Sequence, residues 1–494
     1  MLRKRRGNGS VVIYRLFLVA MIAAVIFFMM RIASGKLETD FSAGQIMHLT
    51  QSYQMGDIYD RSGKMIAKGG KNSQEEYESE KTATAFQDVL GADIYETLGI
   101  RNNICSNALW VYGTEANELS VKNLIAPSKV EKKGGDVQLT LDKELQEHLA
   151  DMVAESGYEK AYVIVSNYKT GEILALYSNG GNCLDDTLYP GSTIKPFYFA
   201  AALTVDPKVI NYTYDCEPDT HNFGSGIQKV HINCAGKARH DVVDSYTGMA
   251  RSCNAFYISL LDHMDRNKLL EALKVWGFDS SYSFQQFRYN DHSFEGQSGK
   301  TNRSAAKAVT AGMKKLGIDL REKNLRYAVI GQGNTTITPE ALNFLTGALL
   351  NGGTLKEPVW IKAKRTSAAL EEWETLKSEK EYVMCQKEIA DTVVGLLAGV
   401  MESGTGRAFA MPEAGLVGKT GTAQKAESTG ALSGKQTVLY TGGLTGETGE
   451  ENPIAITVAF DDVESSVTST AAGVFAKNVL TYMLSEGGIK NEQE

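Results

Sequence analysis

The chain has 494 residues, of which 43% are hydrophobic and 22% are charged. This content is enough to bury a large hydrophobic core and excludes intrinsic disorder as the main state. The formal net charge of −8 argues against a nucleic-acid binder that relies on a general cationic surface. Frequent glycine (48 residues) and scarce proline (9 residues) exclude collagen-like and proline-rich architectures. A turn-rich globular protein with more than one structural unit is therefore expected.

The N-terminal segment has the pattern of a membrane anchor. Four consecutive basic residues, 3–6, precede an uncharged apolar run from Leu16 to Met30. We expect residues 1–12 to form a cytoplasmic basic tail and residues 13–33 to form one transmembrane helix. The chain after this helix is then extracytoplasmic, because positive charge concentrates on the cytoplasmic side of a span. The alternative is a cleaved signal peptide, since the small residues at 33–35 resemble a cleavage site.

The remaining chain divides into a small polar N-terminal region at 34–134, a larger unit at 135–485 and a polar tail at 486–494. Strand-like runs occur at both ends of the larger unit, and helical patterns dominate between them. The unit is therefore expected to be α+β, with a sheet that joins sequence-distant segments. The expected strands are 137–141, 161–166, 173–178, 415–422, 437–444 and 454–460, and the expected helical stretches are 192–275, 338–403 and 471–484.

One pair of residues suggests nucleophilic chemistry. Pro190 and Gly191 break the chain immediately before Ser192, and Lys195 follows three positions later at the start of an apolar helix. Positions three apart share a helix face, so the serine hydroxyl and the lysine amine are expected within hydrogen-bond reach. A desolvated lysine is neutral often enough to act as the base that a serine nucleophile needs. A solvated surface pair is the alternative when this motif is taken alone.

Two further clusters strengthen the chemical interpretation. Ser252 and Asn254 are two residues apart and cannot share a helix face, which predicts a turn between helices. The tetrad Lys419, Thr420, Gly421 and Thr422 follows a strand-like run. Glycine inside a strand often marks the close approach of a ligand to the backbone. The alternatives are an ordinary polar helix junction and an ordinary strand end.

Six cysteines follow the apolar run. Cys216 and Cys234 lie in one polar segment with His221, His231 and His240 nearby. The spacing matches no zinc signature, so a local disulfide or free thiols are favoured over a zinc site.

In order and together, Ser-x-x-Lys, Ser-x-Asn and Lys-Thr-Gly resemble the motif set of penicillin-binding proteins and class A β-lactamases. The surrounding sequence is similar to the transpeptidase domain of penicillin-binding proteins across about 135–485, and the segment at 57–63 resembles the start of the membrane-anchored class B members. The short region before the domain suggests the compact type called penicillin-binding protein A. The resemblance implies a β-lactamase/transpeptidase-like domain, with a central antiparallel sheet and a helical subdomain, behind one N-terminal transmembrane helix and a small N-terminal module.

The resemblance also implies a serine D-Ala-D-Ala transpeptidase that cross-links peptidoglycan stem peptides through an acyl-enzyme and is inhibited by β-lactams. Expected partners are stem peptides, the lipid-linked precursor, the membrane and a membrane glycosyltransferase of the shape, elongation, division or sporulation family. No cofactor and no metal are expected to be needed. The implied catalytic residues are Ser192 (nucleophile), Lys195 (base), Ser252 (proton relay), Asn254 (donor orientation), Lys419, Thr420, Gly421 and Thr422 (carboxylate binding and oxyanion hole).

Three alternatives share these motifs. A β-lactamase must deacylate rapidly and has no need of an anchor with 100 further residues. A β-lactam sensor usually carries a larger signalling part. A division or elongation scaffold with the transpeptidase fold would have a defective site, whereas all three motifs are intact here.

Overall fold

The computed structural model describes Met21 and residues 56–69, 75–90, 136–277 and 323–485. The predicted anchor and both predicted tails fall outside the described residues, apart from Met21. In the part of the chain that is described, no helix has the length and apolar character needed to cross a membrane. Positions inside the last two ranges that are not described are 185, 218–220, 225–228, 235–238, 333–334, 366–372, 376–380 and 427–431.

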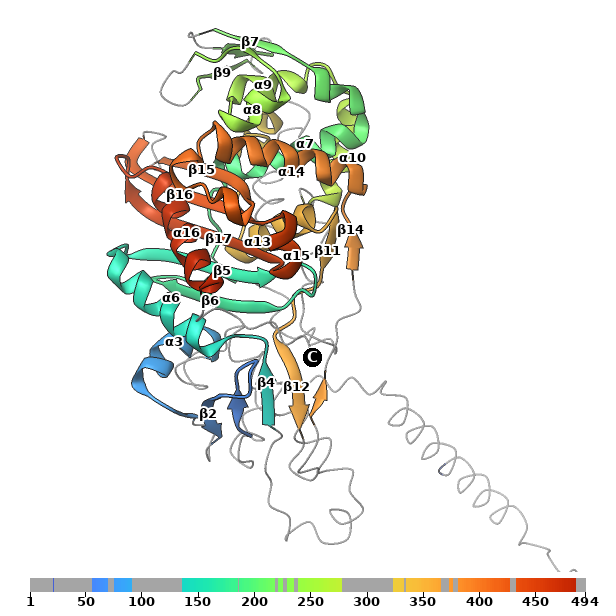
Figure 1. Ribbon diagram of the computed structural model, residues 1–494. Helices are drawn as coiled ribbons and strands as arrows, with labels where there is room; N and C mark the ends of the chain where they lie inside the picture. Colours follow the sequence, from blue (N-terminus) through green and yellow to red (C-terminus); the bar gives the residue numbers. More distant parts are fainter. Residues whose placement is uncertain are drawn as a thin grey trace, which may run out of the picture.

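A five-stranded antiparallel sheet with the order β15-β16-β17-β5-β6 lies at the centre of the molecule (Figure 1). Its two hairpin strands β5 and β6 come from the beginning of the large unit, and its other three strands come from the end. This arrangement confirms the predicted α+β class with a sheet of sequence-distant segments. The strands are β5 (Lys160–Asn167), β6 (Ile173–Asn179), β15 (Leu416–Ala426), β16 (Leu432–Leu444) and β17 (Ile454–Glu464).

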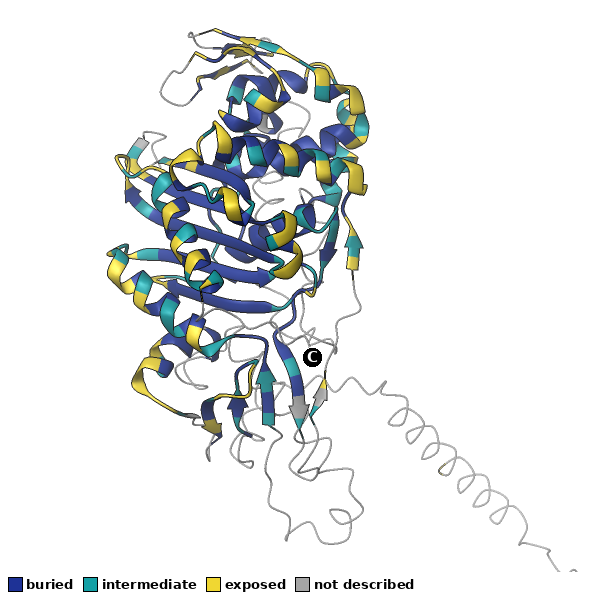
Figure 2. Cartoon of the chain, in the orientation of Figure 1, coloured by how far each residue is buried: buried dark blue, intermediate teal, exposed yellow. Residues whose placement is uncertain are grey.

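Alternate side chains of β17 face two different helical layers, as the period of a strand requires. On one face, the hydroxyl of Thr457 lies 2.8 Å from that of Thr441, which lies 2.7 Å from the hydroxyl of Thr346 in α13. On the other face, Phe460 packs edge-on against Phe475 of α16. Figure 2 shows that the strands between these layers are buried. The covering helices are α6 (Lys143–Ser156), α13 (Pro339–Leu350) and α16 (Thr470–Leu484).

A mainly helical part adjoins the edge strand β15 (Figure 1). Helix α7 lies at its centre, because every residue from Lys195 to Leu203 is buried. The helical segments of this part are η3 (Gly191–Ile194), α7 (Lys195–Val205), η4 (Pro207–Asn211), α8 (Ser245–Ala250), α9 (Asn254–Leu260), α10 (Arg266–Val275), α12 (Lys323–Ala328), α14 (Lys387–Glu402) and η9 (Arg407–Phe409). Two short segments lie next to the central sheet strands: η10 (Pro412–Ala414) precedes β15, and α15 (Gly446–Glu451) connects β16 to β17.

Helices dominate both stretches in which the sequence predicts helical patterns, but short strands interrupt them. Strands β7 and β10 pair, as do β8 and β9, inside 192–275, and β11 pairs with β14 inside 338–403. Three-residue strands are too short for alternation to be visible in a sequence. They are β7 (Tyr214–Cys216), β8 (His221–Phe223), β9 (Val230–Ile232), β10 (Asp241–Val243), β11 (Thr354–Lys356) and β14 (Glu381–Val383).

A second sheet, with the order β13-β12-β4-β1-β2-β3, lies at the opposite end of the molecule from the helical part (Figure 1). It combines strands from the predicted region 34–134 with three strands from the predicted large unit, so the two regions share one sheet. Helix α3 (Glu80–Leu90) follows the last strand of this sheet, β3, in the chain. The strands are β1 (Ile58–Tyr59), β2 (Met65–Gly69), β3 (Glu75–Tyr77), β4 (Asp136–Leu139), β12 (Ile361–Arg365) and β13 (Glu374–Thr375).

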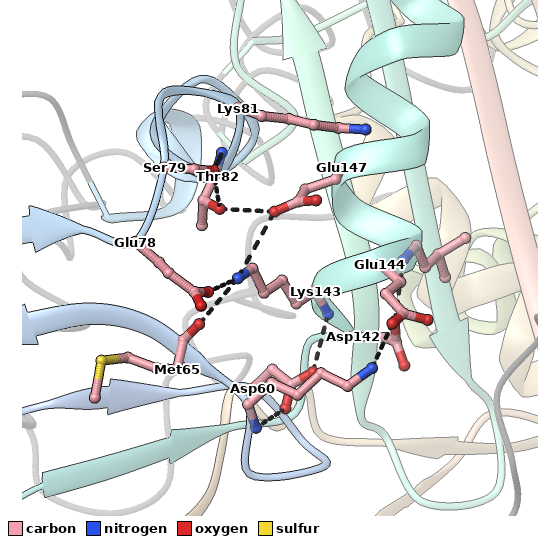
Figure 3. Close-up of polar contacts among 12 residues, drawn as sticks. Asp60, Met65, Glu78, Ser79, Lys81, Thr82, Asp142, Lys143, Glu144 and Glu147 are labelled. Carbon is pink, nitrogen blue, oxygen red and sulfur yellow. Dashed lines mark hydrogen bonds and ion pairs between the residues drawn. The ribbon is translucent and has the colours of Figure 1, made fainter.

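Polar contacts join this second sheet to the first turn of α6 (Figure 3). The Lys143 ammonium donates to the carbonyl of Met65 at 3.1 Å and pairs with Glu78, while its backbone N–H donates to Asp60 at 3.3 Å. One turn further along α6, Glu147 accepts a hydrogen bond from Thr82 at 2.7 Å. Since α6 also packs on β6, these contacts connect the N-terminal strands to the central sheet.

Candidate active site

Ser192 and Lys195 lie at the junction between the sheet and the helical part. Ser192 belongs to the single turn η3, and Lys195 is the first residue of α7. Gly191 has a positive φ of 51°, a conformation that glycine adopts at low cost and that begins the turn. The hydroxyl-bearing Ser192 is half-buried, whereas Lys195 is fully buried.

The Lys195 amine contacts the Ser-x-Asn motif. Its Nζ atom lies 2.7 Å from the carbonyl oxygen of Ser252, 3.1 Å from the Ser252 Oγ atom and 2.8 Å from the Asn254 Oδ1 atom. These acceptors match the three N–H donors of an ammonium group. Among the described residues, no hydrogen bond joins Ser192 Oγ to Lys195 Nζ, so the predicted hydroxyl-to-amine contact is not formed in this structure. Lys195 also lies over the Tyr257 ring, 5.2 Å from its centroid.

The predicted turn at Ser252 is present. Helix α8 ends at Ala250, and α9 begins at Asn254, with Cys253 as its N-cap. Ser252 has a positive φ of 59°, which is uncommon outside glycine. This backbone conformation directs both the carbonyl and the hydroxyl of one residue to the same lysine.

Strand β15 brings the Lys-Thr-Gly motif against the turn that holds Ser192. A Cβ atom on Gly421 would lie 2.7 Å from the Pro190 carbonyl oxygen, and one on Gly191 would lie 2.7 Å from the Thr422 carbonyl oxygen. Only glycine allows backbones to approach this closely. Because β15 is an edge strand, alternate N–H and C=O groups on it point away from β16, and the turn η3 lies against this strand.

Two buried lysines share the site. Burial lowers the pKa of Lys195 to about 8, and the nearby Cys253 and Cys234 oppose this shift. Burial, followed by the charge of Lys195, holds the pKa of Lys419 well below its usual range. Among the described residues, neither lysine has a carboxylate partner within ion-pair distance. Lysine amines with lowered pKa values can exchange protons near neutral pH. Without a carboxylate partner, they can also attract an anionic ligand.

Thr405 is a site residue that lies outside the three sequence motifs. Its Oγ1 atom lies 2.5 Å from the Thr420 Oγ1 atom, and its backbone N–H donates to the Ala250 carbonyl at 3.1 Å. The neighbouring Gly404 packs so tightly that a Cβ atom would lie 2.2 Å from the same carbonyl. The loop after α14 thus ties the end of α8 to β15.

The structure thus brings the three sequence motifs together from three separate elements: the start of α7, the α8–α9 turn and the edge strand β15. This combination defines the class of penicillin-interacting serine proteins. Residues 161–481 match the family model described as "Penicillin binding protein transpeptidase domain", and the chain belongs to this family.

Two curated relatives are similar to this chain in sequence. Stage V sporulation protein D of Bacillus subtilis is 22% identical over 386 residues, which cover 73% of this chain and 55% of the relative. Peptidoglycan D,D-transpeptidase MrdA of Acinetobacter baumannii is 23% identical over 407 residues, which cover 71% of this chain and 54% of the relative. The chain spans about half the length of these curated relatives.

Solved structures share the fold. Penicillin-binding protein A of Mycobacterium tuberculosis aligns with a TM-score of 0.65 at 17% identity and covers 87% of this chain and 99% of its own. Penicillin-binding protein 3 of the same organism, in complex with aztreonam, aligns with a TM-score of 0.63 at 18% identity, covering 87% and 96%. The D,D-transpeptidase domain from Eggerthella lenta aligns with a TM-score of 0.60 at 19% identity, covering 87% and 98%.

Proposed function

We propose that this chain is a peptidoglycan D,D-transpeptidase that works through an acyl-enzyme on Ser192. The observation that carries the proposal is the contact of the buried Lys195 amine with Ser252 and Asn254, beside a half-buried Ser192 and the edge strand β15. Membership of the transpeptidase family supports it, as does the name of one relative, a peptidoglycan D,D-transpeptidase.

Acylation begins when the Ser192 hydroxyl attacks the carbonyl carbon of the penultimate D-Ala of a stem peptide. Lys195 in its neutral form accepts the hydroxyl proton, which requires the amine to turn from its present acceptors toward Ser192. A bond forms between Ser192 Oγ and the carbonyl carbon, and the bond to the terminal D-Ala nitrogen breaks. The result is one ester and one released amino acid.

During the attack, negative charge develops on the oxygen of the penultimate D-Ala carbonyl, next to two backbone N–H donors. The N–H of Ser192 belongs to the first turn of a helical segment, where N–H groups lack partners within the helix. The N–H of Thr422 belongs to the edge strand that packs on Gly191. Loss of one such donor typically costs about 10² to 10³ in rate.

The other motif residues handle the leaving group and the substrate carboxylate. Ser252, which is within 3.1 Å of Lys195, relays the proton to the departing amine together with Lys419. Asn254 orients the donor amide. The hydroxyls of Thr420 and Thr422 hold the terminal carboxylate, with the buried Lys419 behind them, and its lowered pKa rises again when the anion binds.

We further propose that the chain is anchored by 13–33 with its N-terminus in the cytoplasm and its catalytic part outside. Its substrates are then stem peptides and their lipid-linked precursor, and its natural partner is a membrane glycosyltransferase of the shape, elongation, division or sporulation family. The basic residues 3–6 before the apolar run support the anchor and its orientation. The names of the two relatives, a sporulation protein and a peptidoglycan D,D-transpeptidase, support the peptidoglycan substrate.

Labelled penicillin tests the proposal directly. Incubation with the full-length chain should add the mass of penicillin to the peptide that contains Ser192. Ser192→Ala should abolish labelling and leave the melting temperature unchanged, because this half-buried hydroxyl makes no essential packing contact. Ser156→Ala, at the end of α6, is the matched control and should label normally. Labelling of another serine would overturn the assignment.

A further inference from the structure

Four buried side chains form a cluster directly behind the Ser252 turn. Cys216 ends β7, Cys234 follows β9, His240 precedes β10 and Cys253 is the N-cap of α9. Their sulfur and ring nitrogen atoms all lie within 4.8 Å of one another. Three thiols and one imidazole are a donor set that suits a tetrahedral Zn²⁺ ion.

The distances within the cluster match those of a tetrahedral metal site. Zn–S bonds of about 2.3 Å and Zn–N bonds of about 2.1 Å require about 3.8 Å between two sulfur ligands and about 3.6 Å between sulfur and nitrogen. The structure has 3.8 Å between the sulfur atoms of Cys216 and Cys234 and 3.7 Å between those of Cys234 and Cys253. It has 3.6 Å between Cys216 Sγ and His240 Nδ1.

The same distances argue against a disulfide. A disulfide joins two sulfur atoms at about 2.05 Å, and all described cysteines are free. One sulfur, that of Cys234, lies at nearly equal distances from two others, as expected when a common ligand holds all three. The disulfide that the sequence allows between Cys216 and Cys234 is therefore not formed in this structure.

The groups around the cluster are arranged as outer partners of metal ligands. His221 Nδ1 lies 3.0 Å from the Tyr214 hydroxyl, and its Nε2 atom lies 3.5 Å from Cys216 Sγ. When the hydroxyl donates to Nδ1, the Nε2 atom carries the proton and donates to the thiolate. The backbone N–H of Phe256 donates to Cys253 Sγ at 3.5 Å. Such hydrogen bonds stabilise the anionic ligands of a metal and fix their orientation.

We propose that Cys216, Cys234, His240 and Cys253 bind one Zn²⁺ ion that holds the Ser252 turn in its active conformation. Binding releases the three thiol protons and leaves a site with a net charge of −1. The ion fills a structural role, because four protein ligands leave no position open for substrate.

The metal acts on the turn through Cys253, the middle residue of the Ser-x-Asn motif. Ser252 and Asn254 flank this ligand on either side, and both accept hydrogen bonds from Lys195. Ser252 and Asp241 are two of the three non-glycine residues with positive φ among those described, and each is next to a ligand in the sequence. A positive φ at a non-glycine residue persists only where the surrounding structure enforces it. Metal bonds to the neighbouring ligands, Cys253 and His240, would hold both residues in this conformation.

The pairs β7–β10 and β8–β9 also explain why a metal is needed here. Each of these strands has three residues, and isolated two-stranded ribbons of this kind are marginal in water. A metal that joins the ends of β7, β9 and β10 to α9 reinforces the few buried side chains of these ribbons, such as Phe223, Ile232 and Val243.

Metal analysis of the full-length chain, purified in detergent without chelators or a metal-affinity step, tests the proposal. We expect about one zinc ion per chain, and we expect Co²⁺ to replace it with the intense visible bands of tetrahedral thiolate cobalt. C216S, C234S and H240A should each lose the metal. H240C should retain it, since four thiolates also bind zinc. C385S, which removes a buried thiol outside the cluster, is the matched control and should keep one zinc ion.

A purified chain without zinc that shows no cobalt bands, or a native chain with a bond between Cys216 and Cys234, would overturn the metal site. Zinc retained by C234S would do so as well. The effect on the turn rests on the proposed function and has a separate measurement, in which metal loss slows penicillin acylation by about tenfold or more. A chain that binds zinc and never acylates would refute the proposed function and leave the metal site standing.

Discussion

Lys195 is buried between two helices and the sheet, and its protonation state decides whether it accepts the Ser192 proton. Burial lowers its pKa to about 8. The groups that face it are Cys253 and Cys234, whose negative charge would favour protonation, and Lys419, whose pKa burial and the charge of Lys195 hold well below its usual range. At neutral pH most Lys195 amines are therefore still protonated, and the neutral, active fraction increases as pH rises.

We predict that the rate of penicillin acylation rises with pH, reaches half of its maximum near the Lys195 pKa of about 8 and then levels off. Lys195→Arg should lower the rate by roughly 10² to 10⁴, because a guanidinium stays protonated. Lys169→Arg, which keeps an exposed ion pair with Glu450, is the matched control. Stopped-flow labelling across the pH range measures both. A rate that does not change across this range would exclude Lys195 as the base.

Some site residues are easier to predict from the sequence than others. Ser192 and Lys195 are recognisable because a helix start and a three-residue spacing define their relation within one short segment of the chain. Thr405 is harder to predict from spacing, because its contact with Thr420 depends on how a loop folds back from α14 to β15. The cysteine cluster has the same difficulty, since its ligands come from three strand ends and one helix cap.

Among elements, the long ones follow from the sequence. The hairpin β5–β6, the strands β15 to β17 and helix α16 lie close to their predicted positions because each has a long apolar pattern. Helix α6 begins directly after Asp142, whose side chain caps it by accepting a hydrogen bond from the Leu145 N–H. The three-residue strands are defined by tertiary pairing and leave no local pattern.

The turn at Gly331 shows how elements are held together at the site. The Gly191 N–H donates to the Gly331 carbonyl at 3.1 Å, and a Cβ atom on Gly331 would lie 1.9 Å from the Gly191 carbonyl oxygen. Both residues have positive φ. The turn that positions Ser192 therefore has no space for a side chain at 331.

We predict that Gly331→Ala lowers stability and slows acylation. The substitution combines an unfavourable φ with a steric clash, and together these should lower the free energy of unfolding by about 2 to 4 kcal/mol. Gly434→Ala is the matched control, because Gly434 also has positive φ but has open space around its Cβ position. The Gly434→Ala variant should lose only about 1 kcal/mol of unfolding free energy and should be acylated at the normal rate. Denaturant unfolding and penicillin labelling of both variants measure the difference. Equal effects of the two substitutions would show that the contact at Gly331 is unimportant.

At the scale of the whole molecule, the N-terminal sheet is continuous with the larger unit. Strands β4 and β12 from the larger unit lie between β13 and β1, and Arg365 of β12 pairs with Asp136 of β4 at 2.5 Å. The sequence predicts a boundary near residue 135 because composition changes there. The amino-acid composition cannot predict that two strands more than 200 residues apart in the chain pair with each other.

Asp60 connects the two units, and we predict a large effect of removing it. This buried carboxylate accepts hydrogen bonds from the N–H groups of Ser62 and Lys64. It also accepts one from the backbone N–H of Lys143 (Figure 3). Asp60→Ala should lower the unfolding free energy by about 2 to 3 kcal/mol, since three backbone N–H groups lose a buried, charged acceptor. The matched control is Asp151→Ala, which removes an exposed partner of Lys81. This change should alter the unfolding free energy by less than about 1 kcal/mol. A comparable small loss in Asp60→Ala would contradict this role.

Mixing the full-length chain with excess chromogenic cephalosporin separates a transpeptidase from a β-lactamase in one experiment. A transpeptidase acyl-enzyme lacks a base positioned to activate water, and the tethered leaving group of a β-lactam blocks the acceptor. We therefore predict a burst of about one equivalent of product, followed by deacylation over minutes to hours. A lifetime of an hour corresponds to a barrier of about 22 kcal/mol. Sustained turnover at several cycles per second would contradict the transpeptidase assignment and identify a β-lactamase.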